Sequence, residues 1–214
     1  MPGCLINDVE DLRLPEKEFQ EDFGLTILRA DEMTENLLAN DLWNNLSRAE
    51  SLLVFPGNGA SIVEKFILRS NFEWLDKWRN KEKIFSKRVW CPGEDPRIYA
   101  EKIFGDKFFL GIKDVVIIDD VISSGKTIAK IMKENQPFIP NARWHAISWV
   151  KQRSASGKKF FTLDAAKFAG EPNRKAPVNS ISTLLSDDKI ARSFAKRNFA
   201  GQADRFLDLL AQIY

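Results

Sequence analysis

The sequence predicts an α/β fold in which a central parallel sheet is flanked by helices. Short apolar runs alternate along the chain with segments of helical periodicity, the pattern of strands joined by crossover helices. The clearest run, 114–120, is apolar on both faces, as expected of a central parallel strand. Of the 214 residues, 44% are hydrophobic and 29% are charged, which is the balance of a globular chain.

The composition argues against several classes of protein. No run approaches the ~20 apolar residues that a membrane-spanning helix needs, and the acidic first residues lack the apolar core of a secretory signal. Two cysteines, Cys4 and Cys91, make no disulfide framework, and the single histidine, His145, makes no histidine-rich metal site. The net charge of +2 is too small for a strongly basic nucleic-acid binder. We therefore expect a cytoplasmic protein that binds neither membrane nor nucleic acid.

The first half of the chain supplies the first elements of the expected fold. Residues 1–24 are acidic and are expected to form an irregular lead. Apolar residues at helical spacing predict a helix over 31–49. The apolar run 51–55 ends at turn residues and predicts a buried strand, after which Ser61 is expected to cap a helix. The segment 88–90 is expected to be a second strand.

The second half continues the alternation. We expect a helix at about 126–135, strand 142–150, a short strand at 159–163, a loop at 164–182, and helices at 187–199 and 202–213. Ser186 is the expected cap of the helix over 187–199, whose first turn carries two acidic residues that the helix dipole favours.

Charge is distributed unevenly between the two ends of the chain. The first 50 residues carry 12 acidic and 4 basic side chains, whereas the last 64 carry 6 and 12. Either the two ends pack together, or the basic part meets an anion, or the two faces are simply solvated. We assign residues 46–163 to the core, and 1–45 and 164–214 to elements packed on the same domain.

Two adjacent carboxylates, Asp119 and Asp120, end the clearest strand. Ligands of open parallel sheets bind beyond the carboxyl ends of strands, where such a pair can accept hydrogen bonds from two neighbouring hydroxyls or face a divalent cation. The small-residue loop from Ser123 to Thr127 then opens a helix, so its free amides can hold a phosphate, with Lys126 adding positive charge. The segment therefore predicts a site for a ribose 5-phosphate.

Other interpretations of this segment fit less well. The ending Gly125-Lys126-Thr127 is that of a Walker phosphate loop, but that motif needs a glycine where the acidic Asp120 stands. A phospho-receiver domain also uses paired acids, but places them in its first strand rather than beyond mid-chain. A chance combination of strand end and helix cap remains the alternative without function.

Residues 115–127 resemble the 13-residue phosphoribosyl pyrophosphate (PRPP) motif of type I phosphoribosyltransferases. The resemblance implies a Rossmann-like core with a variable hood, which we assign to the two ends of the chain. It implies that Asp119 and Asp120 bind the ribose 2- and 3-hydroxyls. It also implies that the 5-phosphate is bound by the whole following loop, namely Ser123, Ser124, Gly125, Lys126 and Thr127.

A second segment stands where this family has a loop whose backbone binds the pyrophosphate of PRPP. It is Pro56-Gly57-Asn58-Gly59, directly after the first expected core strand. Glycines there would let the backbone approach a phosphate closely. Such a run is more often a simple turn, but its order and spacing relative to residues 115–127 favour a binding role.

The family also has a mobile loop that closes over the reaction, and residues 92–113 fall in its place. Arg97, Lys102 and Lys107 are candidates for a catalytic positive charge there, and the sequence does not choose between them.

The resemblance implies a transferase of nucleotide metabolism, specifically a glycosyltransferase. It would move the 5-phosphoribosyl group from PRPP to a nitrogen of a nucleobase or related acceptor and release pyrophosphate, with Mg²⁺ held mainly by PRPP near Asp119 and Asp120. Members acting on 6-oxopurines carry an aspartate where this chain has Ser123, which argues against such an acceptor. We expect a homodimer, with a further protein partner left open. The alternative is a regulatory protein, or a subunit of a larger assembly, that binds PRPP or a nucleotide without catalysis.

Overall fold

The computed structural model describes residues 3–9, 12–46, 50–70, 84–85, 112–122, 125–137, 139–151 and 177–213. The strands expected at 88–90 and 159–163 lie outside these ranges. The described part of the chain is an α/β protein with parallel sheets flanked by helices, which confirms the predicted fold class. The chain forms two compact units, a core unit of residues 33–168 and an outer unit that joins residues 1–32 to 169–214.

The core unit contains a parallel sheet with the strand order β4-β3-β5-β6. Its strands are β3 (Ser51–Val54), β4 (Ile84–Phe85), β5 (Asp114–Ile122) and β6 (Arg143–Lys151). The expected strands at 51–55, 114–120 and 142–150 are thus present. β5 lies inside the sheet and extends two residues past the acidic pair.

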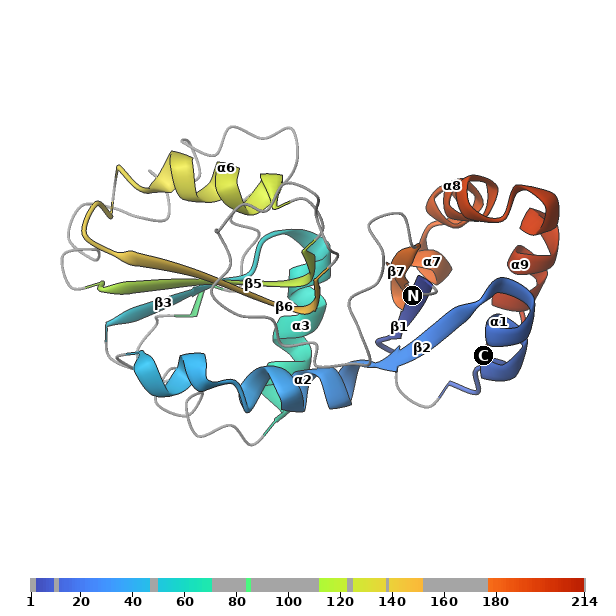
Figure 1. Cartoon of the computed structure of the whole chain (residues 1–214), viewed down its shortest axis with the longest axis horizontal. Helices are drawn as coiled ribbons and strands as arrows, with labels where there is room; N and C mark the ends of the chain where they lie inside the picture. The colour runs from blue at the N-terminus through green and yellow to red at the C-terminus, as the bar shows by residue number, and fades with distance from the viewer. Residues whose placement is uncertain are drawn as a thin grey trace. The chain divides into compact units, whose positions relative to one another are not determined.

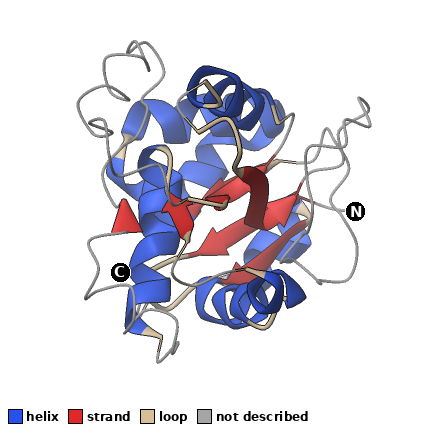
Figure 2. Ribbon diagram, turned by 90° about the vertical axis from the view of Figure 1, so that its left-hand side faces the viewer, coloured by secondary structure: helices blue, strands red, loops and turns tan. Residues whose placement is uncertain are grey.

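Helices cover both faces of this sheet (Figures 1 and 2). On one face, Val115 and Ile117 of β5 pack with Ile128 and Ile131 of α6 (Lys126–Asn135). On the other face lie α2 (Ala30–Leu38) and α3 (Gly57–Arg69). Both contact Trp149 of β6.

Trp149 is wholly buried, and its contacts show how α2 and α3 are fixed. Its indole Nε1 donates a hydrogen bond to Thr34 Oγ1 of α2 over 3.1 Å. Its ring meets Phe66 of α3 edge-on, with the ring centroids 5.5 Å apart. One tryptophan of the sheet therefore joins two helices that precede it by roughly a hundred residues in the sequence.

Two expected helix boundaries in the core are wrong. The helix expected over 31–49 ends at Leu38, because Asn40 adopts an extended conformation and its side chain accepts from the amide of Leu42, which opens the 3-10 helix η1 (Asp41–Asn45). α3 begins at Gly57 rather than at Ser61. The predicted core, 46–163, lies within the core unit, which also takes in η1 and most of α2.

The outer unit is built around a second parallel sheet, with the order β2-β1-β7. Its strands are β1 (Gly3–Asn7), β2 (Leu25–Arg29) and β7 (Val178–Ser180), and its helices are α1 (Glu16–Phe23), α7 (Ile181–Ser186), α8 (Asp188–Asn198), η3 (Ala200–Gln202) and α9 (Ala203–Leu210). The expectations of an irregular lead at 1–24 and a loop throughout 164–182 are therefore wrong. β1 pairs with strands about 20 and 170 residues away in the sequence, so local sequence patterns do not predict that it forms a strand.

The two ends of the chain pack together in this unit. Phe19 and Phe206 are wholly buried, with ring centroids 5.8 Å apart, and Phe199 stacks on Phe206 at 5.0 Å. An ion pair joins Asp22 of the acidic end to Arg205 of the basic end. The opposite charges of the two ends thus meet within one unit, as one of the three interpretations of the charge pattern anticipated.

None of the helices in the described ranges is both long enough and apolar enough to span a membrane.

Candidate functional site

The candidate site lies at the carboxyl end of β5, where the acidic pair stands. The amide of Asp120 donates to Asp119 Oδ1 over 3.0 Å, and the amide of Val121 donates to Asp120 Oδ1 over 2.8 Å. Both acidic side chains are partly buried rather than freely solvated. These backbone hydrogen bonds hold the two carboxyl groups close to the strand end.

The two motifs predicted separately from the sequence meet here. β3 pairs in parallel with the first half of β5, Ser51 to Val54 lying opposite Asp114 to Ile117. α3 begins soon after β3 ends, so its first residues reach the same edge of the sheet as the acidic pair. A Cβ built on Gly59 would overlap the carboxyl group of Asp120. The glycine-rich segment and the acidic pair are therefore in direct contact.

The electrostatics of the pair follow from its burial. Burial first, and then the negative charge of neighbouring Asp120, raise the pKa of Asp119 to about 9. A carboxyl group with that pKa is protonated at neutral pH. A side-chain hydrogen bond to Asp120 also favours the protonated form, so the pair shares this proton and presents its remaining oxygens as acceptors. Acceptor oxygens suit vicinal hydroxyls, which can donate to them.

The first turn of α6 follows the acidic pair in the chain. Gly125 is the N-cap of this helix and lies in the left-handed region, with φ 69° and ψ 5°. As a glycine it has no side chain that could accept hydrogen bonds from the first amides of the helix. Lys126 and Thr127 are exposed in the first turn. Backbone amides at such a helix start, with a lysine beside them, suit a phosphate group. Ser123 and Ser124 lie outside the described residues.

The glycine-rich segment opens α3 in a similar way. Pro56 is the N-cap and gives no side-chain hydrogen bond. Gly57 has a φ of 79°, and no atom lies within 4 Å of a Cβ built on it. Asn58 belongs to the first turn of the helix. Arg97, Lys102 and Lys107, the candidates for a closing-loop cation, lie outside the described residues.

A magnesium ion implied by the resemblance is compatible with these groups. Within the described ranges, no cluster of three or more histidine, cysteine or acidic residues is placed to hold a metal ion. Two carboxyl groups at one strand end are oxygen donors of the kind that magnesium prefers. An ion near them would take its other oxygens from a phosphorylated ligand and from water, as expected for magnesium bound together with its substrate.

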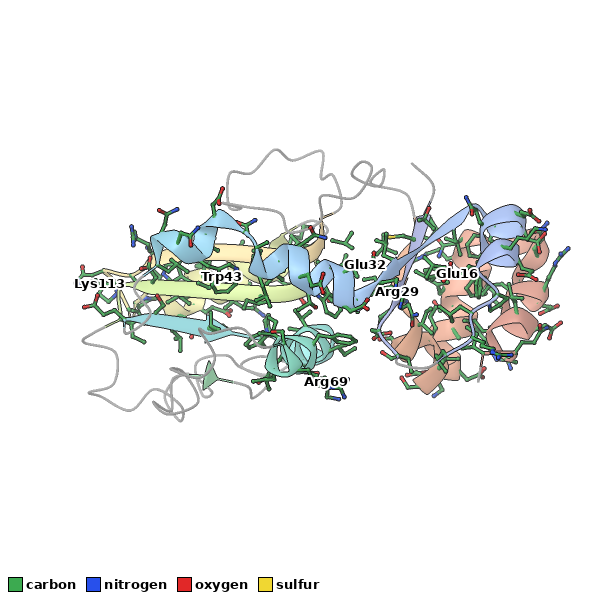
Figure 3. All side chains as sticks on the ribbon, turned by 90° about the horizontal axis from the view of Figure 1, so that it is seen from below. Glu16, Arg29, Glu32, Trp43, Arg69 and Lys113 are labelled. Carbon is green, nitrogen blue, oxygen red and sulfur yellow. The ribbon has the colours of Figure 1, made fainter. Side chains whose placement is uncertain are left out.

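A polar cluster that the sequence analysis missed lies at the opposite, amino end of β5. Asp114 is wholly buried and receives hydrogen bonds from Arg143 Nε at 2.8 Å and from a second guanidinium nitrogen at 2.9 Å, while His145 Nε2 lies 2.9 Å away. Burial alone would raise the pKa of Asp114, but the hydrogen bonds from Arg143 and His145 outweigh it, and the pKa is lowered. Lys113, which is labelled in Figure 3, pairs with Glu50 at the same end of the sheet.

This amino-end cluster accounts for the single histidine as a structural residue of β6. Its position at the far end of the strands separates His145 from the acidic pair. The signal in the sequence was an aspartate directly before an apolar strand, with an arginine and a histidine opening the next one. Cys4 is also inert, because burial in β1 raises the pKa of its thiol to about 12.

Comparison with models of protein families gives no match, and no curated protein matches the sequence. Among solved structures, the chain is similar to the Helicobacter pylori xanthine-guanine-hypoxanthine phosphoribosyltransferase, with a TM-score of 0.43 and 11% sequence identity. The similarity covers 75% of this chain and 90% of that one. That protein bears the name of the family whose PRPP motif residues 115–127 resemble. At this TM-score and identity, the function of the chain has to be inferred from its own residues.

Proposed function

We propose that the chain is a Mg²⁺-dependent phosphoribosyltransferase that moves the 5-phosphoribosyl group of PRPP to a nitrogen of a nucleobase or related acceptor and releases pyrophosphate. One observation carries the proposal: Gly59 of the glycine-rich segment touches Asp120 of the acidic pair. The two segments that would hold the two ends of the scissile bond are thereby brought to one sheet edge.

Each segment has a separate task in this reaction. The acidic pair accepts hydrogen bonds from the ribose 2- and 3-hydroxyls and leaves a net negative charge beside a ring that becomes cationic in the transition state. The start of α6, with Lys126 and Thr127, holds the 5-phosphate. The start of α3 presents amides to the departing pyrophosphate. Magnesium, when bound with PRPP, supplies charge neutralisation on that leaving group.

The chain thus contributes mainly position and electrostatics. Because the ribose and the pyrophosphate are both held in fixed positions, the anomeric carbon that joins them is oriented for the displacement before the reaction begins. Ser123 stands where 6-oxopurine enzymes of this family carry an aspartate, so we propose an acceptor outside that class.

A second function is favoured by the nature of the groups at the site. The acidic pair and the starts of α3 and α6 are all groups that hold a ligand, and a protein that only senses PRPP would need every one of them. Within the described residues, no group stands out as a base for the incoming nitrogen. A regulatory PRPP-binding protein is therefore the alternative that the first experiments should separate.

Binding is tested by titration calorimetry with PRPP and Mg²⁺. The wild-type chain is expected to bind, and the double variant Asp119→Ala/Asp120→Ala is expected not to bind. The matched control is Asp31→Ala/Glu32→Ala, which removes another adjacent acidic pair, one that is exposed and forms ion pairs with Arg29. Glu32 and Arg29 are labelled in Figure 3. Unchanged affinity in the first double variant would overturn both functions.

Catalysis is tested by pyrophosphate release with PRPP, Mg²⁺ and a panel of nucleobases, including orotate and adenine. Release that depends on one base and is lost in the double variant supports the transferase. Tight binding of PRPP with no release by any member of the panel supports the regulatory protein instead.

A further inference from the structure

At its closest, the contact between Gly59 and Asp120 is made by the side chain of Asp120. The three heavy atoms nearest to a Cβ built on Gly59 are Oδ1, Cγ and Oδ2 of Asp120. All three distances are shorter than those that real Cβ atoms show, and the longest of them, to Oδ2, is 2.5 Å. The space that an alanine methyl group would occupy is therefore filled by this one carboxyl group, and none of those three atoms belongs to the backbone.

The same carboxyl group is also held by the backbone of β5. The amide of Val121 donates to Asp120 Oδ1 over 2.8 Å. The oxygen that accepts this bond, Oδ1, is also the atom nearest to the Cβ position of Gly59, so the carboxylate is in contact with both Gly59 and its own strand. A methyl group at position 59 would push the carboxylate out of this place and break the hydrogen bond to Val121, while the backbones of α3 and β5 could stay where they are.

We propose that Gly59 is a positioning residue for the ribose-binding carboxylate, acting through Asp120 and not through contact with the pyrophosphate. This inference rests on the proposed function for its ligand. It gives the glycine-rich segment a second task, because the start of α3 fixes the orientation of a group on β5. The pyrophosphate segment and the ribose segment then behave as one unit when PRPP binds.

Gly57 provides the contrast within the same segment. It has a φ of 79° and open space around its Cβ position, so it is a glycine because of its backbone conformation. Gly59 has no positive φ, and a larger residue is excluded there by the carboxyl group of Asp120. Alanine at position 57 strains the backbone and leaves Asp120 in place, whereas alanine at position 59 displaces Asp120.

The first test needs no ligand and uses the ¹H–¹⁵N resonance of the Val121 amide. Gly59→Ala is expected to shift this resonance as Asp120→Ala does, and to shift it no further when Asp120 is already alanine. Gly57→Ala is expected to leave it unchanged. A Val121 resonance that Gly59→Ala moves no more than Gly57→Ala does would overturn the inference.

The second test is a double-mutant cycle on PRPP affinity in the presence of Mg²⁺. Gly59→Ala is expected to weaken binding about tenfold or more, as loss of a well-placed charged acceptor does. The Gly59→Ala/Asp120→Ala variant is expected to bind no more weakly than Asp120→Ala alone. Gly57→Ala is expected to add its full effect in either background.

The outcomes separate the two proposals. If the losses from Gly59→Ala and Asp120→Ala multiply, Gly59 acts on the pyrophosphate directly and the positioning role is overturned. If the wild-type chain binds no PRPP, the proposed function fails, and the Val121 resonance still decides whether Gly59 sets the carboxylate of Asp120.

Discussion

The replacement Asp119→Asn should change how stability depends on pH. In the folded chain, burial and then the charge of Asp120 raise the pKa of Asp119 from 3.8 to about 9. In the unfolded chain the group returns to its ordinary value. Between these two pKa values the folded state therefore holds a proton that the unfolded state has released. The stabilisation is complete below the ordinary pKa and is lost as the pH rises toward the folded one.

The size of the effect follows from one proton. Each pH unit within the window lowers the free energy of unfolding by up to ~1.4 kcal/mol, so the contribution of Asp119 falls by on the order of 4 kcal/mol between pH 5 and pH 8. Asparagine has nearly the same shape, retains an Oδ1 to accept from the Asp120 amide, and does not ionise. The variant should therefore become more stable than the wild type as the pH rises.

Urea denaturation followed by tryptophan fluorescence measures this difference at pH 5, 6, 7 and 8 without ligand. The control is Asp31→Asn, which removes an exposed carboxylate from the first turn of α2. Asp114 does not interfere, because its pKa is lowered and its contribution changes only in acid. If wild type and Asp119→Asn keep a constant separation from pH 5 to pH 8, the carboxyl group is not held protonated and the reasoning fails.

Three further predictions concern the outer unit. Phe206→Ala removes a wholly buried ring from the phenylalanine cluster and should cost about 3–5 kcal/mol in urea denaturation, and a cost below 1 kcal/mol would contradict the packing described. Asp187→Ala removes the side chain that accepts from the amides of Lys189 and Ile190 and should cost about 1 kcal/mol, whereas Asp187→Asn should restore most of it. Gly3→Ala would place a methyl group 2.5 Å from the carbonyl oxygen of Pro177 and should lower stability by about 1–3 kcal/mol. Gly201→Ala, where the space is open, is the control for that last measurement, and equal costs at the two glycines would refute it.

The core strands and the segment after β5 could be predicted because their signals are local. A continuous β-branched run, an acidic pair and a small-residue loop stand within one short stretch of sequence, and the helix over 126–135 follows with the predicted bounds. The strands at 51–55 and 142–150 were confirmed for the same reason. The first is a short apolar run, and the second is rich in apolar and aromatic residues, so each indicates a strand by itself.

The strands of the outer unit could not be predicted, because they are short and their partners are distant, whereas α8 and α9 confirm the helices expected at 187–199 and 202–213. β7 has three residues, and it pairs with β1 at the other end of the chain. Such strands form because the phenylalanine cluster buries both ends together, not because of local propensity. The cap at Asp187 in place of Ser186 was missed by one residue, since both residue types cap helices well.

The sequence alone identifies the chemical groups around the carboxyl end of β5: two carboxyl groups, then a small-residue loop, then a helix start. The order of these groups along the chain is fixed by the covalent sequence, so it can be recognised without any tertiary contact. Tertiary structure alone decided the state of those groups. Pairing of β3 with β5 brings Gly59 against Asp120, and the burial of Asp119 raises its pKa to about 9. Contact and desolvation depend on residues far apart along the chain, so they exist only after the chain has folded.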